Sequence, residues 1–196
     1  MSTVPADGAR LLSTAILERG RVEGTLLKVD DFLNHRVDPV LIAAVGSSLA
    51  ERFSADAPQV VLTAEASGIP PALACALHLG VAMVFAKKYL GPGGRDVVAR
   101  EVYSPTRGME YRVEVGRRAL AHGERVLVVD DFLAGGRTAE ALGEIVEEAG
   151  GRVVGFGFAI EKTFQSGRPR LLAHGWRVEA LVRVTSLEGG RATLEI

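Results

Sequence analysis

The sequence predicts an α/β protein with a central, mostly parallel sheet that helices flank on both sides. Four short apolar runs, rich in β-branched residues and followed by small or turn-forming residues, have the character of buried strands. These runs are residues 59–64, 81–86, 125–129 and 152–160. Helical stretches follow the first and the third run, and this alternation is typical of a parallel sheet covered on both faces. We therefore expect residues 1–196 to form a single domain around one main core.

The helices can be placed from the spacing of their apolar residues. Residues 9–19 and 39–53 are expected to form amphipathic helices ahead of the sheet, with an extended piece at residues 25–29 between them. Residues 69–79 form the helix after the first strand. Residues 136–149 form the best marked helix, because apolar residues recur at helical spacing and two glycines follow its end.

The C-terminal part predicts a short helix at residues 168–174 and strands at residues 178–184 and 192–196. These elements are too few to make a second core. We expect them to form, with the N-terminal residues, a small hood over the sheet that spans about residues 1–37 and 161–196.

A glycine- and proline-rich stretch at about residues 88–114 is longer than an ordinary connection within a compact domain. The alternation of polar and apolar residues in VAREVY and YRVEV favours a flexible β-hairpin. Long loops of this kind commonly cover binding sites, so we expect a flexible lid, with a merely tolerated loop as the alternative.

Composition and charge exclude several classes of protein. The chain has 23 Lys and Arg against 24 Asp and Glu, a net charge of -1, so no overall basic field favours nucleic acid or an anionic membrane as a partner. No apolar run approaches the roughly 20 residues of a membrane span, and the first residues lack a secretory signal. The single cysteine, Cys75, lies in an apolar run and is expected to be a small buried residue. We expect a cytoplasmic protein.

The segment VLVVDDFLAGGRT, residues 126–138, predicts a ribose phosphate site. Asp130 and Asp131 follow a buried strand, and open parallel sheets bind ligands beyond the carboxyl ends of their strands. The small residues after them permit a sharp turn whose N–H groups, with a helix N-terminus behind them, suit a phosphate. Carboxylates would repel that anion, so we expect them to bind sugar hydroxyls or a magnesium ion instead.

Two other interpretations of this segment are possible. A phosphoacceptor receiver domain also begins with RVLVVDD and a helix, but it needs a further Asp at the end of a later strand, and none follows Asp131. The acidic pair could also be a solvated strand end. The same letters VDDFL recur at residues 29–33, where no glycine turn follows, so we do not expect a second phosphate loop there.

In this segment the chain resembles the type I phosphoribosyltransferases, whose motif is an apolar run, an acidic pair, two apolar residues and a small-residue turn that ends in Thr. The resemblance implies that the catalytic Asp130 and Asp131 hold the ribose hydroxyls of phosphoribosyl pyrophosphate. It also implies that the turn wraps the 5-phosphate with Ala134, Gly135, Gly136, Arg137 and Thr138. The family often has Thr in place of Gly135 and Gly in place of Arg137, so one hydroxyl contact is lost and a guanidinium is gained.

The resemblance further implies a magnesium ion that phosphoribosyl pyrophosphate carries, without direct ligation by the protein, and a homodimer. Further segments that span most of the chain are similar to the bacterial xanthine phosphoribosyltransferases. They are LLKVDDFLNHRVDP, AEASGIPPAL, VAMVFAKK, VYS and FAIEKTFQSGR. In that family the purine is contacted at positions that correspond to Leu27, Asn34 and Lys162. Xanthine has carbonyl oxygens at C2 and C6, to which an amide and an ammonium can donate, whereas guanine would present an amino group at C2.

Each of these assignments has a plainer alternative. Lys162 could form a surface ion pair with Glu161, and Asn34 could be a turn residue. Ser67 could simply cap the helix that follows. In the functional interpretation the loop after the first strand instead cradles the pyrophosphate through Glu65, Ala66, Ser67 and Gly68.

Charged and aromatic residues of the second strand and the lid complete the expected site. Lys87 and Lys88 end the second strand, where we expect one to face the pyrophosphate and the other to be solvated. Tyr103 and Arg107 are lid residues that could grip the phosphates.

The implied reaction transfers the 5-phosphoribosyl group from phosphoribosyl pyrophosphate to xanthine and gives xanthosine 5'-monophosphate and pyrophosphate, a purine salvage reaction. One alternative is the same reaction with guanine, hypoxanthine or adenine, because the sugar site is common to these enzymes. Another is a regulator that senses phosphoribosyl pyrophosphate and binds DNA. That regulator would need a helix-turn-helix extension and a basic face, which the helices ahead of the sheet do not supply.

Overall fold

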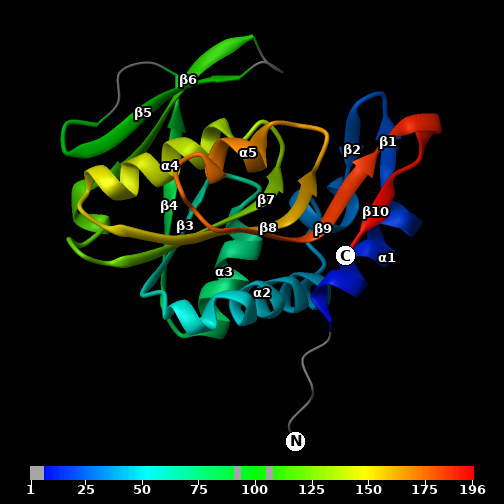
Figure 1. Cartoon of the computed structure of the whole chain (residues 1–196), viewed down its shortest axis with the longest axis horizontal. Coiled ribbons are helices and arrows are strands. Elements are labelled where there is room, and N and C mark those ends of the chain that lie inside the picture. Colours follow the sequence, from blue (N-terminus) through cyan, green and yellow to red (C-terminus); the bar gives the residue numbers. More distant parts are fainter. Residues whose placement is uncertain (1–6, 91–93, 105–107) are drawn as a thin grey trace, which may run out of the picture.

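The protein, in a computed structural model that describes residues 7–90, 94–104 and 108–196, is built around one eight-stranded sheet (Figure 1). In spatial order its strands are β10 (Thr193–Glu195), β9 (Val178–Ser186), β8 (Arg152–Lys162), β7 (Arg125–Leu133), β3 (Val60–Ala64), β4 (Ala82–Tyr89), β6 (Met109–Gly116) and β5 (Val97–Ser104). Strands β9, β8, β7, β3 and β4 pair in parallel, and β10, β6 and β5 pair antiparallel at the two ends. The predicted α/β class with a mostly parallel sheet is confirmed.

Helices cover both faces of this sheet, as the strand-helix alternation predicts. They are α1 (Gly8–Arg19), α2 (Pro39–Phe53), α3 (Ile69–Leu79), α4 (Arg137–Glu148) and α5 (Gly167–Leu172). In Figure 1, α2 and α3 lie below the sheet and α4 and α5 above it, while α1 packs beside α2 near β9. Among the described residues, none of the helices combines the length and the apolar character that crossing a bilayer requires.

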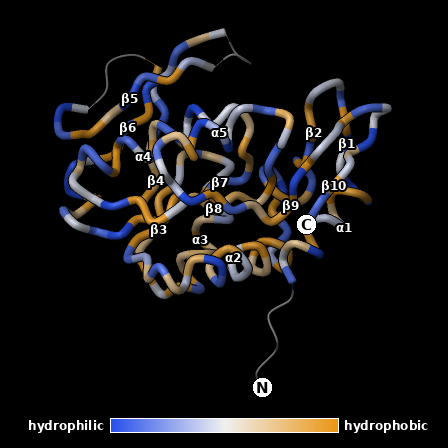
Figure 2. Tube along the Cα trace, in the orientation of Figure 1, coloured by the Kyte–Doolittle hydropathy of each residue, from blue (hydrophilic) through white to orange (hydrophobic). Residues whose placement is uncertain are grey.

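One apolar cluster lies on each face of the sheet. Phe53 and Leu127 belong to the cluster between the sheet and helices α2 and α3. Leu142 and Phe156 belong to the cluster between the sheet and helix α4. All of them are fully buried, and each such side chain contributes about 1.5–3 kcal/mol to folding. Figure 2 shows this distribution, with hydrophobic colour concentrated along the inner strands and in α2 and α3. Cys75 of α3 is buried as expected, and burial raises the pKa of its thiol to about 12.

A separate two-stranded hairpin, β1 (Arg21–Glu23) and β2 (Leu26–Lys28), precedes the helical turn η1 (Asp30–Asn34). The second copy of VDDFL falls in this turn, where Asp31 pairs with Arg21 at 2.9 Å. No glycine loop forms there, in agreement with the sequence interpretation. Short 3-10 turns complete the described elements: η2 (Ser54–Asp56), η3 (Arg117–Ala119) and η4 (Glu188–Gly190).

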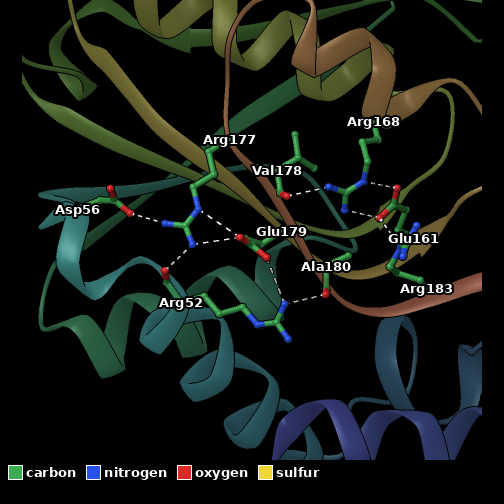
Figure 3. Close-up of polar contacts among 9 residues, drawn as sticks. All are labelled: Arg52, Asp56, Glu161, Arg168, Arg177, Val178, Glu179, Ala180 and Arg183. Atoms are coloured by element: carbon green, nitrogen blue, oxygen red, sulfur yellow. Dashed lines mark hydrogen bonds and ion pairs between the residues drawn. The ribbon is translucent and has the colours of Figure 1, made fainter. Parts of the chain in front are cut away.

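Strand β9 corrects part of the expected hood. Residues 178–184 and 192–196 are expected in the hood, but β9 pairs in parallel with β8 and β10 pairs with β9, so both strands continue the main sheet. Strand β9 carries two charged residues, Glu179 and Arg183. Figure 3 shows that these charges are neutralised locally, because Glu179 pairs with Arg52 and Arg183 lies beside Glu161. Paired charges can be accommodated in a partly buried strand at much lower cost than isolated ones.

The predicted lid forms the antiparallel hairpin β5–β6, which adjoins the sheet where β6 pairs with Lys87–Tyr89 of β4. The hairpin also lies against α4 (Figure 1). Arg107, which we proposed as a lid residue, falls outside the described residues.

Candidate active site

The acidic pair lies within β7 and not after it, because pairing with β8 continues through Leu133 and Glu161. The Asp131 N–H donates to Asp130 Oδ1 and the Phe132 N–H to Asp131 Oδ1, both at 2.9 Å, so each carboxylate is oriented by the backbone that follows it. Burial, and then the neighbouring charge of Asp131, raises the pKa of Asp130 well above its usual range. A ligand that donates hydrogen bonds to these oxygens, or a cation, would relieve this unfavourable charge.

The loop between β7 and α4 borders a cavity of about 270 Å³, which we call the loop cavity. Gly136 adopts a φ of +75°, and a Cβ there would lie 2.8 Å from the Gly167 Cα, so only glycine fits. Gly135 has neither constraint, since nothing lies within 4 Å of its Cβ position. No side chain caps α4, whose first N–H groups are therefore available to an anion. Arg137 and Thr138 line the same cavity.

The loop after β3 approaches the acidic pair from the neighbouring strand. A Cβ on Gly68 would lie 2.3 Å from Asp130 Oδ1 and 2.2 Å from Thr63 Oγ1, so this contact also requires glycine. Glu65, Ala66 and Ser67 line a second cavity of about 810 Å³, which we call the β3 cavity. Ser67 does not cap α3, which begins after Gly68 without a side-chain cap, so the capping alternative for Ser67 is wrong.

Both lysines that end β4 are exposed, and Lys88 lines the β3 cavity. The Lys88 N–H donates to Glu65 Oε1 at 2.7 Å, which ties the β3 loop to β4 and occupies the Glu65 carboxylate. The Lys88 ammonium lies 5.8 Å from the centre of the Tyr111 ring, and its charge acts on Asp130. A pyrophosphate in the β3 cavity would therefore meet one ammonium.

Leu27, Asn34 and Lys162, which are far apart in the sequence, line one further cavity of about 580 Å³, the Lys162 cavity. Phe132 forms part of its wall, 5.7 Å from the Lys162 Nζ. The Lys162 side chain is only 7% exposed and donates to the Thr25 carbonyl at 3.1 Å. Burial lowers the pKa of this ammonium.

The alternative in which Lys162 pairs with Glu161 is wrong. Figure 3 shows the Glu161 carboxylate facing the Arg168 guanidinium, with contacts of 2.6 and 2.7 Å, and Arg183 beside it. Neighbouring residues of a strand point to opposite faces, so Glu161 and Lys162 cannot share one environment.

Asn34 lines both the β3 cavity and the Lys162 cavity. Its Nδ2 lies 3.4 Å from Asp131 Oδ2, which links the helical turn η1 to the acidic pair. Its Oδ1 is buried, and no described residue donates to it. Buried polar atoms are normally satisfied, so this oxygen is positioned to accept a hydrogen bond from a ligand.

Several residues of the site were not identified from the sequence. Tyr111 lines both the loop cavity and the β3 cavity, His35 lines the β3 cavity, and Gln165 lies between the loop cavity and the Lys162 cavity. Phe132 and Gln165 stand within or beside recognised segments and could have been noticed. His35 follows Asn34 within the segment LLKVDDFLNHRVDP and could have been noticed as well. Tyr111 belongs to the predicted hairpin, but nothing in that pattern places it at the site, which it reaches only through the packing of distant elements.

The loop that carries Gln165 packs directly on the β7–α4 loop. A Cβ on Gly167 would lie 2.3 Å from the Ala134 carbonyl oxygen. Arg170 of α5 donates to the Gly135 carbonyl at 3.0 Å and to Glu140 at 2.8 Å. Tyr103 lines the loop cavity from β5, with its ring 5.9 Å from the Arg137 guanidinium carbon.

Comparison with known proteins agrees with this geometry. Residues 38–179 match the family model described as the phosphoribosyl transferase domain. Curated relatives named xanthine phosphoribosyltransferase include one from an Exiguobacterium species, 47% identical over 90% of this chain and 93% of its own. Another, from Shouchella clausii, is 45% identical over 92% of both chains.

Solved structures show the same architecture. Adenine phosphoribosyltransferase from Rhodothermus marinus has a TM-score of 0.75 and 30% identity and covers 91% of this chain and 99% of its own. The enzyme of the same name from Saccharomyces cerevisiae, solved with adenine and an imino-altritol bisphosphate, has a TM-score of 0.74 at 24% identity, over 90% of this chain and 99% of its own. At that identity the likeness concerns the fold alone.

Proposed function

This chain belongs to the phosphoribosyl transferase family, and from that premise we propose that it transfers the 5-phosphoribosyl group of phosphoribosyl pyrophosphate to xanthine. The observation that carries the proposal is the arrangement of three cavities. Asp130 lines the first, and Asn34, which contacts Asp131, lines the other two. The loop cavity suits the 5-phosphate, the β3 cavity the pyrophosphate and the Lys162 cavity the base. Asp130 and Asp131 lie where the ribose would join them.

The donors and acceptors of the Lys162 cavity favour xanthine among the purines. The Lys162 ammonium can donate only, so it suits a carbonyl oxygen and repels an amino group. The unpaired Oδ1 of Asn34 can accept from a ring N–H, and its Nδ2 can donate. Xanthine offers two carbonyl oxygens and ring N–H groups, whereas adenine and guanine carry amino groups. The curated relatives described above are named for xanthine.

In the proposed reaction a ring nitrogen of xanthine attacks C1 of the ribose while the bond from C1 to the pyrophosphate oxygen breaks. The bonding electrons leave with the pyrophosphate, and the proton of the imidazole N–H is released to solvent. The charge that develops on the ribose in an oxocarbenium-like transition state is stabilised by the carboxylates of Asp130 and Asp131, which also hold the hydroxyls. Lys88 and the N–H groups of the β3 loop stabilise the departing pyrophosphate. No protein nucleophile takes part, so positioning of the two reactants supplies much of the rate enhancement.

Magnesium is proposed to accompany phosphoribosyl pyrophosphate. The carboxylate oxygens of Asp130 and Asp131 are of the kind that magnesium prefers, and phosphate enzymes commonly hold this ion through few carboxylates together with substrate oxygens. When bound, the ion supplies positive charge beside the pyrophosphate.

We also propose that the protein acts as a homodimer in the cytoplasm. Large apolar side chains on neighbouring elements, Leu73 and Leu77 of α3 and Phe85 of β4, are exposed and would be covered by a second copy. Light scattering on the purified protein tests this part.

The central test is to incubate the purified protein with magnesium, phosphoribosyl pyrophosphate and each purine in turn and to measure the nucleotide formed. We expect xanthine to give the highest kcat/KM. Equal or faster turnover of guanine, hypoxanthine or adenine would contradict the assigned base. No turnover with any base, together with binding of phosphoribosyl pyrophosphate, would favour the sensor alternative.

A further inference from the structure

We propose that Tyr111 is a positioning residue for phosphoribosyl pyrophosphate, which orients the Thr138 hydroxyl in the loop cavity and the Lys88 ammonium in the β3 cavity. The inference rests on the proposed function, because it assigns the two ends of that substrate to these cavities.

The placement of Tyr111 on β6 is the first observation. Among the described residues that line the loop cavity and the β3 cavity, it is the one that both share. Its hydroxyl lies 2.6 Å from Thr138 Oγ1 in the first turn of α4, and its ring centre lies 5.8 Å from the Lys88 Nζ. The side chain is half-buried. Tyr111 therefore forms the wall between the two cavities and contacts a polar group on each side.

The hydrogen bond to Thr138 acquires a direction when a phosphate binds. Without a ligand, either hydroxyl can be the donor. A phosphate oxygen accepts only, so the Thr138 hydroxyl must donate to it and can then accept from Tyr111. Hydrogen bonds arranged in such a chain strengthen one another. Tyr111 thus fixes the rotation of the Thr138 hydroxyl in the orientation that a phosphate needs.

The ring of Tyr111 acts on the other side of the wall. The attraction between an ammonium and the face of an aromatic ring limits the directions in which the long lysine side chain can extend. Lys88 lies near the end of β4, and its backbone N–H is bound to Glu65 of the β3 loop. Lys88 lines the β3 cavity, and the ring of Tyr111 limits the directions that its ammonium can take beside that cavity.

Two substitutions separate these contributions. Tyr111→Phe removes the hydroxyl and keeps the ring, while Tyr111→Leu removes both.

The probes are ribose 5-phosphate and pyrophosphate, each titrated separately in the presence of magnesium by calorimetry. For Tyr111→Phe we expect the Kd of ribose 5-phosphate to rise about twofold to tenfold, as for the loss of a neutral hydrogen bond, with the Kd of pyrophosphate unchanged. For Tyr111→Leu we expect the Kd of pyrophosphate to rise as well, about twofold to fivefold. Glu110→Gln, an exposed neighbour on β6, is the matched control and should change neither.

A double-mutant cycle distinguishes positioning from a structural role. If Tyr111 acts through the hydroxyl of Thr138, then Tyr111→Phe should have no further effect on ribose 5-phosphate binding in a Thr138→Val protein. A structural role would instead give additive losses in the two variants. Equal weakening of both probes in Tyr111→Phe, or no change in either, would overturn the proposal while leaving the proposed function intact. A wild-type protein that bound neither probe would overturn the proposed function and the role of Tyr111 with it.

Discussion

Lys162 is the residue on which recognition of the base depends most directly. Its ammonium is buried, already donates to the Thr25 carbonyl and has further N–H groups to offer a purine oxygen. Lys162→Met keeps the length and apolar stem of the side chain but removes these donors. We expect kcat/KM for xanthine to fall about tenfold to a hundredfold, as for the loss of one hydrogen bond to a charged group, with the KM of phosphoribosyl pyrophosphate unchanged. Steady-state kinetics with each substrate varied in turn measure both quantities.

The control for this prediction is Lys28→Met, which removes a lysine of β2 that pairs with Glu23 on the surface. It should leave both kinetic constants as they are. An equal loss in the two methionine variants would mean that Lys162 does not contact the base.

The raised pKa of Asp130 makes the free energy of unfolding depend on pH. Its pKa in the folded protein is raised by burial and by the charge of Asp131, so the folded state binds this proton more tightly than the unfolded state. The stabilisation is fully present below the usual pKa of aspartate, about 3.9, and is lost as the pH rises through the raised value. The substrate-free protein should therefore lose stability across that range from this group.

Asp130→Asn should remove this loss, because the amide stays neutral and can donate to Asp131. At neutral pH we expect the variant to be more stable than the wild type and to have little transferase activity. Thermal unfolding of both proteins between acid and neutral pH, without substrate, measures the difference. If the difference in unfolding temperature between the two proteins were the same at all pH values, the assigned direction of the Asp130 pKa shift would be wrong.

The residues that could be predicted from the sequence are those that stand together in it. Asp130 to Thr138 form one uninterrupted motif, and Glu65 to Gly68 follow a clear strand. The proximity of Lys162 to Leu27 depended on resemblance, since no local pattern joins residues so far apart. Neither local motifs nor the resemblance identifies Tyr111 as a site residue, because its position follows from how the hairpin packs on α4.

At the scale of the element, the β7–α4 loop requires a glycine at position 136 but tolerates a side chain at Gly135. Gly135→Thr should fold normally, because its Cβ position is open. The new hydroxyl adds a donor beside the 5-phosphate, so we expect the KM of phosphoribosyl pyrophosphate to fall about twofold or more. Gly136→Ala should lose about 1–2 kcal/mol of stability from its left-handed backbone alone, and the contact with Gly167 adds to this. Chemical denaturation and kinetics of both variants measure these effects, and similar behaviour of the two would contradict the geometry.

The loop between β8 and α5 depends on the pair of Glu161 and Arg168. Glu161 is 2% exposed, so Arg168→Met leaves a buried carboxylate with only the more distant Arg183, at 3.7 Å. We expect a loss of about 3 kcal/mol in the free energy of unfolding. The double variant Glu161→Leu, Arg168→Met should be more stable than Arg168→Met alone, because it removes the unpaired charge. Urea denaturation tests this order, and the reverse order would show that the unpaired Glu161 carboxylate is not what destabilises Arg168→Met.

Helices were predicted more closely than strands, for a physical reason. Capping residues and apolar spacing mark helices locally, and α2 and α3 agree with the expected residues 39–53 and 69–79. The length of a strand depends on its partner. β7 extends past the acidic pair because β8 continues beside it, and β9 belongs to the main sheet because its charged side chains find partners on other elements.

At the scale of the whole molecule, the parallel sheet explains why the site is where it is. The carboxyl ends of β3, β7 and β8 meet at one edge, which brings together the β3 loop, the acidic pair and Lys162. This much follows from the strand-helix alternation in the sequence. The strand-helix alternation does not predict that η1 and the β5–β6 hairpin also contribute to the site. These elements lie outside the parallel core and reach its edge only after folding.

The contact between Gly136 and Gly167 limits how this protein could be re-engineered for another base. The two glycines touch across the boundary between the loop that holds the sugar phosphate and the loop that borders the base. A side chain at either one would displace the other loop, so variation at these positions would impair the step common to every base. Libraries aimed at new substrates should therefore leave both glycines fixed and diversify Leu27, which lines the Lys162 cavity but not the loop cavity and takes no part in that contact.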